Sequence, residues 1–163
     1  MRWRWWLVAV AGYLSVAGIV GLSAAGGWFY WERVQTRGEE SARAVLPALA
    51  AKEIPEVFGY DYQTVERSLA EAYSFLTPGY RQEFQKSANA QIIPEAKKRE
   101  VVVQANVVGV GVISAKRNSA SVMVYLNRTV TDRTRQPLYD GSRLRVDYHK
   151  IGDSWLIAYI TPI

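Results

Sequence analysis

Five side chains in this sequence have types that suit acid–base catalysis: Asp61, Tyr62, Glu66, Tyr80 and Tyr159. Paired carboxylates and a tyrosine on a concave sheet would suit proton transfer beside a carbonyl. Simpler interpretations exist for each: an N-cap for Asp61, a solvated helix face for Glu66, and packing at the edge of the core for the tyrosines. Nothing in their spacing requires a shared site. We therefore predict no catalytic residues and no enzymatic activity, and retain Tyr62, Tyr80 and Tyr159 only as candidate pocket residues.

Other kinds of chemistry lack the residues they need. The sequence has no cysteine, which excludes disulfides, thiolate metal sites and a cysteine nucleophile. His149 is the only histidine, so a multi-histidine zinc site is excluded, and it shares the polar face of a predicted strand with Arg145 and Asp147. The glycines of Val108–Gly111 lie inside a strand pattern and indicate bends in a curved sheet, not a phosphate-binding loop. We predict no metal and no cofactor.

The first 31 residues predict how the chain is held in place. Residues 5–31 contain no charged side chain, and the apolar run from Leu7 to Phe29 slightly exceeds the ~20 residues that span a bilayer. Tryptophans cluster at both ends of the run, as at two membrane interfaces. Arg2 and Arg4 precede it, which favours a cytoplasmic N-terminus and an exported C-terminal domain. A cleaved signal peptide ending near Ser23–Ala25 is the alternative, and it would also export the domain.

Small residues recur within this predicted transmembrane helix. A stripe of this kind lets a second helix approach closely in lipid, although alanine and glycine are common in membrane helices in any case. The candidate packing residues are Ala17, Gly18, Gly21 and Ala25. The net charge of +5 is scattered along the chain, so we predict contact with membrane lipid and not with nucleic acid.

The remaining residues predict helices followed by strands. Apolar side chains at helical spacing indicate helices over 39–52, 61–76 and about 80–92, the first interrupted by Pro47 and the last ended by Pro94. We expect a turn over 54–60. A valine-rich strand covered on both faces is expected over 101–113, and alternating strands over about 122–130, 144–148 and 155–160. Residues 131–141 read as a loop, and Gly152-Asp153 as a tight hairpin turn.

This order predicts an α+β fold, with about three helices packed on one face of a curved antiparallel sheet of about four strands. We divide the chain into a cytoplasmic tail and transmembrane anchor (1–31), a membrane-proximal helix and turn (32–59) and an exported domain (60–163).

Several segments of the sequence resemble the Mce-associated membrane protein family of actinobacteria. The resemblance begins with Tyr60–Glu66, similar to the tyrosine-aspartate-tyrosine opening of a helix, and continues with Leu76–Arg81, a leucine-threonine turn before an aromatic residue and an arginine. Ile93–Lys97, Ser142–Val146 and Gly152–Ile157 extend it to the final Thr161-Pro162-Ile163. Ala158 and Tyr159 depart from the pattern, because many members carry acidic residues there.

The resemblance implies a fold and a function beyond what the residues themselves indicate. The fold is a SnoaL-like, cystatin-like or nuclear transport factor 2-like cone. The function is that of a non-enzymatic accessory or assembly subunit of an Mce-type lipid import system, located in the plasma membrane with its C-terminal domain in the periplasm. Its expected partners are Mce transporter subunits, and a second copy of the chain is a further candidate. The alternatives are a periplasmic lipid-binding carrier or enzyme that uses the pocket of the fold, and a scaffold subunit of a secretion system.

Overall fold

The computed structural model describes residues 34 and 36–163. The predicted anchor and its small-residue stripe, Ala17, Gly18, Gly21 and Ala25, lie outside the described residues. Within the described part of the chain, no helix is both long enough and apolar enough to cross a membrane. Residues 38–163 form one compact unit.

A long helix over residues 36–58 opens this unit. Ala42, Leu46, Ala50 and Ile54 recur every four residues and are fully buried, so one stripe of the helix packs into the main core. The segment that we had separated as membrane-proximal (32–59) therefore contributes to the core of the domain. The helix also continues through 54–58, where we expected a turn.

Two prolines lie inside this helix, Pro47 and Pro55. Each removes one backbone hydrogen bond, which leaves the carbonyl four residues earlier without its helical donor. Those carbonyls belong to Arg43 and Ala51, both exposed residues, so water can satisfy them. Burial of Ile54 and of Val57, beyond the first proline, favours continuing the helix over ending it.

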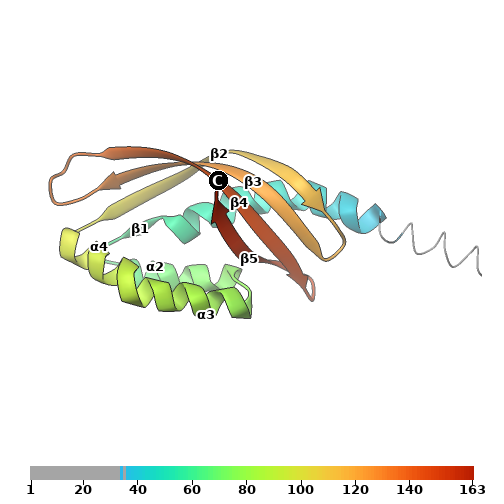
Figure 1. The fold of residues 1–163 in the computed structure, drawn as a ribbon, viewed down its shortest axis with the longest axis horizontal. Helices are drawn as coiled ribbons and strands as arrows, with labels where there is room; N and C mark the ends of the chain where they lie inside the picture. The colour runs from blue at the N-terminus through green and yellow to red at the C-terminus, as the bar shows by residue number, and fades with distance from the viewer. Residues whose placement is uncertain (1–33, 35) are drawn as a thin grey trace, which may run out of the picture. The chain divides into compact units, whose positions relative to one another are not determined.

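The next helices form a second layer (Figure 1). They comprise α2 (Val65–Ala72), the 3-10 turn η1 (Tyr73–Phe75), α3 (Pro78–Ser87), a π-helical turn over Ala88–Ile92 and α4 (Ile93–Arg99). Pro94 does not end the third helix as predicted, because the π-helical turn before it changes the hydrogen-bond pattern there. The helix ends instead at Glu100, which adopts a left-handed conformation (φ 53°).

Five antiparallel strands follow one another across the sheet in the order β1-β2-β3-β4-β5. They are β1 (Tyr60–Asp61), β2 (Val102–Ala115), β3 (Ser119–Thr131), β4 (Leu138–Ile151) and β5 (Ser154–Pro162). The predicted α+β class is confirmed, with one short strand, β1, in addition to the four expected. β4 also begins at Leu138, inside the segment that we had expected to be a loop.

One face of the sheet meets the helices and the other is open. Val122, Val124 and Leu126 of β3 are buried, whereas Tyr125 between them is about half exposed. The same alternation on β4 buries Leu144, Val146 and Tyr148, as predicted from their spacing. We call the open face of the sheet its outer face.

The prediction that β2 is covered on both faces is wrong. Its pairing with β3 shifts register between Val107 and Gly109 and again between Val112 and Ser114. Each bulge inserts one extra residue, and these two residues, Val108 and Ile113, are at least half exposed. The bulge at Gly109 agrees with our interpretation of the glycines as bends in a curved sheet.

Candidate functional site

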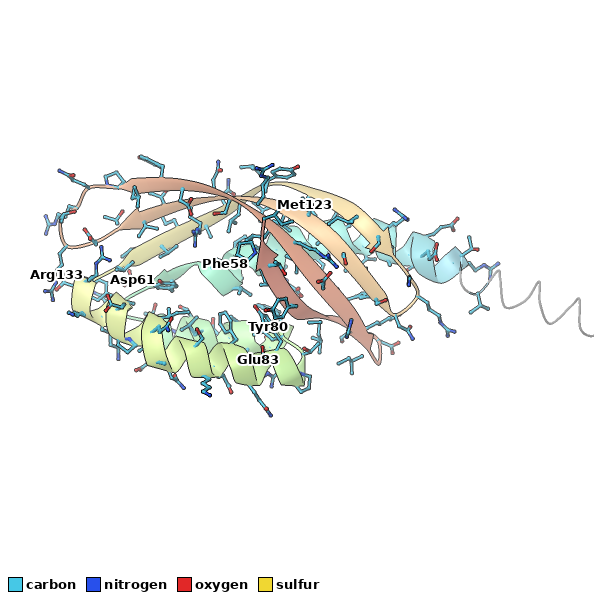
Figure 2. The ribbon with its side chains drawn as sticks, viewed as in Figure 1. Phe58, Asp61, Tyr80, Glu83, Met123 and Arg133 are labelled. Atoms are coloured by element: carbon cyan, nitrogen blue, oxygen red, sulfur yellow. The ribbon has the colours of Figure 1, made fainter. Side chains whose placement is uncertain are left out.

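The three candidate pocket tyrosines lie in two places. Tyr80 of α3 and Tyr159 of β5 are neighbours, with ring centroids 5.3 Å apart, and Figure 2 shows Tyr80 between these two elements. Burial raises the pKa of the Tyr80 hydroxyl, which keeps it neutral. Tyr62 packs instead against a second apolar cluster that contains Val65 and Leu69.

The two candidate carboxylates make local contacts. Asp61 accepts a hydrogen bond from the backbone N–H of Gln63 at 2.9 Å, which forms a turn before α2. The N-cap of α2 is Thr64, so our assignment of Asp61 as the cap is wrong by three residues. Glu66 forms an ion pair with Lys97 at 2.7 Å. The structure therefore does not direct these carboxylates toward the Tyr80–Tyr159 pair.

The most unusual polar contact in the structure was missed by sequence reasoning. Glu53, on the long helix, is only 6% exposed and accepts a hydrogen bond at 3.3 Å from the hydroxyl of Tyr148, which is fully buried on β4. Desolvation raises the pKa of Glu53 to about 7. Desolvation and the nearby carboxylate also raise the pKa of Tyr148. The sequence contains one indication that Glu53 is buried: it lies three residues after Ala50 and seven after Leu46, at the edge of the buried stripe.

A second polar group lies on the outer face of the sheet. Ser121 of β3 donates a hydrogen bond to Asp147 of β4, and Arg145 donates to the same carboxylate at 3.0 Å. These residues border a hollow of about 440 Å³ that also includes Lys116 and His149. His149 is exposed, as predicted. Hydroxyls, cations and one neutralised carboxylate make this a polar, hydrated surface and not an apolar ligand cavity.

A third polar group lies at the other end of the sheet. Arg128 of β3 pairs with Asp140 of β4, which also accepts a hydrogen bond from Ser142 at 3.1 Å. Hydrogen bonds from Arg128 and from the Ser142 hydroxyl lower the pKa of Asp140. The guanidinium lies 6.0 Å from the ring of Phe58, at the end of the long helix. A hollow of about 400 Å³ on this part of the sheet is bordered by Arg128, Asp140 and three amide side chains, those of Gln104, Asn106 and Asn127.

The space between the helices and the sheet is occupied by side chains. Leu46, Ile54, Leu76, Tyr148 and Ile157 are among the largest fully buried residues and belong to one cluster. Among the described residues, no group of three or more His, Cys, Asp and Glu side chains is arranged to hold a metal ion. The outer surfaces of the domain are therefore its best candidates for function.

Comparison with known sequences gives relatives in one organism. The chain is 26% identical over 142 residues to the outer membrane protein Rv1973 of Mycobacterium tuberculosis, a match that covers 87% of this chain and 89% of the relative. It is 25% identical over 142 residues to a second protein of that organism, Rv1362c, covering 85% of this chain and 64% of that protein. No family model matches the sequence.

Comparison with solved structures gives the fold. An IcmL-like type IV secretion system protein of Legionella pneumophila superposes with a TM-score of 0.63 at 14% identity, covering 74% of this chain and 93% of its own. The periplasmic domain of DotI superposes with a TM-score of 0.61 at 12% identity, covering 74% of this chain and 94% of the DotI chain. CagV of Helicobacter pylori, a VirB8 homologue, gives 0.59 at 12% identity, covering 73% and 96%. The chain thus has the nuclear transport factor 2-like fold of these secretion-system domains.

Proposed function

We propose that this protein is a non-enzymatic scaffold subunit of a multi-protein complex in the cell envelope, comparable to the subunits that type IV secretion systems use. Its N-terminal apolar segment anchors it in the membrane and its domain is exported. The observation that carries the proposal is the likeness in fold, which extends over at least 93% of three separate secretion-system chains. The similarity to an outer membrane protein supports a location in the envelope.

The filled interior favours a scaffold over a carrier or an enzyme. A lipid carrier needs an apolar cavity, and here Leu46, Ile54 and Tyr148 occupy the space between the long helix and the sheet. Glu53 and Tyr148, the buried titratable pair, bond to each other and have no room for a substrate between them. A scaffold needs only a stable domain with accessible faces.

Purification from native membranes tests this proposal. The full chain, tagged at its C-terminus and cross-linked in the cell, should be recovered with other envelope proteins in fixed stoichiometry, and deleting its gene should lower the level of at least one of them. Cross-linked masses would also reveal pairing with a second copy. Recovery of the protein alone, with the levels of its envelope neighbours unchanged on deletion, contradicts the proposal.

A second candidate function is an accessory role in Mce-type lipid import. The segments Tyr60–Glu66 and Leu76–Arg81 favour it, because both resemble motifs of that family. The same purification separates the two candidates: Mce transporter subunits among the partners support lipid import, and components of a secretion channel support the first candidate. Lipid that remains bound to the isolated domain would favour the carrier alternative over both.

A further inference from the structure

Two hairpin turns and the start of the long helix meet at one end of the domain. The β2–β3 turn contacts the β4–β5 hairpin through the backbone of Lys150, whose N–H donates to the carbonyl of Asn118 at 2.9 Å. Gly38 packs so closely on the same turn that a Cβ there would lie 2.9 Å from Cγ of Arg117. Figure 1 shows both turns at the end of the sheet where the long helix begins.

Three cations at this end have no acidic partner. Lys116 and Arg117 are exposed and Lys150 is partly exposed, and among the described residues none of them forms an ion pair. Asp153 is the one carboxylate in the two turns. On the first turns of the helix, the two negative charges of Glu39 and Glu40 are matched in number by the positive charges of Arg37 and Arg43.

At the opposite end of the domain, Lys98 and Arg135 are also exposed without an ion pair among the described residues, but most cations there are paired. Lys97, Arg99, Arg128 and Arg133 are each within 3.2 Å of a carboxylate. The free positive charge of the two turns is therefore available to an external anion, whereas these four charges are already neutralised.

Apolar and hydroxyl side chains accompany the free cations. Ile113, the bulge residue of β2, and Ile151, beside the β4–β5 turn, are each 50% exposed. The hollow of about 440 Å³ opens beside Lys116 and presents the hydroxyls of Ser114 and Ser119. Cations next to apolar side chains and hydroxyl donors match the surface of an anionic bilayer, with its phosphates and exposed acyl edges.

We propose that this end of the domain, formed by Lys116, Arg117, Lys150, Ile113 and Ile151, is a docking surface for anionic lipid headgroups. This inference rests on the membrane anchor of the proposed function. Only six residues lie between Trp31, where the uncharged segment ends, and Gly38, so the seven steps of the chain reach at most about 25 Å. The surface potential of an anionic membrane extends about one Debye length, 8–10 Å, and changes partitioning about fivefold for each Lys or Arg within it.

Site-specific quenching in nanodiscs tests the proposal on the full chain. Because the sequence has no cysteine, Asn118→Cys and, at the opposite end, Gln136→Cys each give a single labelling site. Each variant is labelled with a fluorophore and reconstituted into discs of phosphatidylcholine, with or without about 30% phosphatidylglycerol, containing headgroup spin-labelled lipid. We expect quenching at least about twofold stronger at position 118 than at 136, and stronger in the anionic discs, with the excess lost at high salt.

Charge variants supply the matched control. Lys116→Gln, Arg117→Gln and Lys150→Gln together should reduce quenching at position 118 in anionic discs to its level in neutral discs. Lys86→Gln, Lys98→Gln and Arg135→Gln remove the same charge from exposed sites elsewhere and should leave quenching unchanged. Equal quenching at positions 118 and 136, or equal effects of the two charge sets, overturns the proposal. A chain that does not copurify with the discs contradicts the anchor and with it both proposals.

Discussion

At the scale of single residues, the buried Glu53–Tyr148 hydrogen bond is the contact with the clearest consequence. A carboxyl group that is 6% exposed and has one hydrogen-bond donor is easier to bury protonated than ionised. The hydrogen bond from Tyr148 and the charge of Lys52 both lower the pKa of Glu53, but desolvation has the larger effect. Docking of the long helix on β4 therefore depends on the protonation of Glu53.

Because of this pair, the stability of the domain should fall as pH rises. The pKa of Glu53 is about 7 in the folded protein against 4.5 when exposed, so the folded state binds the extra proton. The free energy of unfolding then decreases between about pH 4.5 and pH 7 and is level above, with a total loss of about 3 kcal/mol. Glu53→Gln, which cannot ionise, should remove this slope and exceed the wild type in stability at pH 8. Urea unfolding of residues 38–163 at a series of pH values, followed by Trp155 fluorescence, measures the free energy of unfolding.

Glu56→Gln is the control for this prediction. Glu56 lies one turn further along the same helix but is exposed, so its substitution should leave the slope unchanged. An identical pH dependence in wild type and Glu53→Gln would show that the Glu53 carboxyl titrates as it does in water.

At the scale of elements, the long helix is stabilised by its buried stripe more than by its own sequence. It contains two prolines, each of which costs about 3 kcal/mol in a helix interior. Only tertiary packing offsets such a cost, and Ala42, Leu46, Ala50 and Ile54 are all 0% exposed. The stripe therefore determines where the helix continues.

Substitutions at adjacent positions should show this dependence. Leu46→Ala should lower the free energy of unfolding by about 2–4 kcal/mol, because it opens a cavity between the helix and the sheet. Val45→Ala, at a position that is 46% exposed, should change it by less than about 0.5 kcal/mol. Equal effects in urea titrations would mean that the helix is not packed on the sheet.

Glu100 offers a second prediction at this scale, this time of stabilisation. It ends α4 in a left-handed conformation, and the N–H of Val101 donates to the carbonyl of Ala96 at 2.9 Å, as in a Schellman motif, where glycine is favoured. Glu100→Gly should stabilise the domain by about 0.5–1 kcal/mol, since the ion pair that it loses with Arg133 is exposed and worth little. Glu95→Gly, inside the same helix, should destabilise by about 1 kcal/mol. The measurement is the midpoint of thermal unfolding, and a lower midpoint for Glu100→Gly would contradict the prediction.

The elements that the sequence predicted well are those with one buried face. Leu144, Val146 and Tyr148 alternate with charged residues, and both the strand and its inward face followed from that pattern. The first half of β4 was missed because two polar residues take the positions that continue its inward-facing series and so break the apolar alternation. Asp140 accepts from Arg128, and Ser142 donates to Asp140. The predicted turn over 54–60 and the predicted helix end at Pro94 were wrong, because packing outweighed local propensity in the first case and a π-helical turn did so in the second.

The candidate site was harder to predict than the fold. Tyr80 and Tyr159 are 79 residues apart in sequence, and their contact depends on how α3 packs along β5. Glu53 was overlooked because it lies between the predicted helix (39–52) and the predicted turn (54–60), and its buried hydrogen bond is to a hydroxyl 95 residues away. Contacts of this kind come from the tertiary arrangement of elements and have no local pattern.

At the scale of the whole molecule, the domain has two chemically distinct ends. The end at Gly38 carries a cluster of unpaired cations and exposed isoleucines, and the end at the β3–β4 connection carries most of the ion pairs of the described residues and a polar hollow. For a scaffold, such an asymmetry would orient the domain, with the Gly38 end toward lipid and the opposite end toward a protein partner.

Topology is the prediction that decides between an exported and a cytoplasmic scaffold. The segment 5–31 is uncharged and is preceded by Arg2 and Arg4, so we expect the domain outside the cytoplasm. In intact cells, a membrane-impermeant maleimide should label Gln136→Cys, an exposed site in the β3–β4 connection, within minutes. A cysteine added before Met1 should be labelled only after lysis. The reverse pattern would place the domain in the cytoplasm and exclude the envelope complex as its site of action, whereas labelling of both cysteines in intact cells would show that the N-terminal segment does not span the membrane.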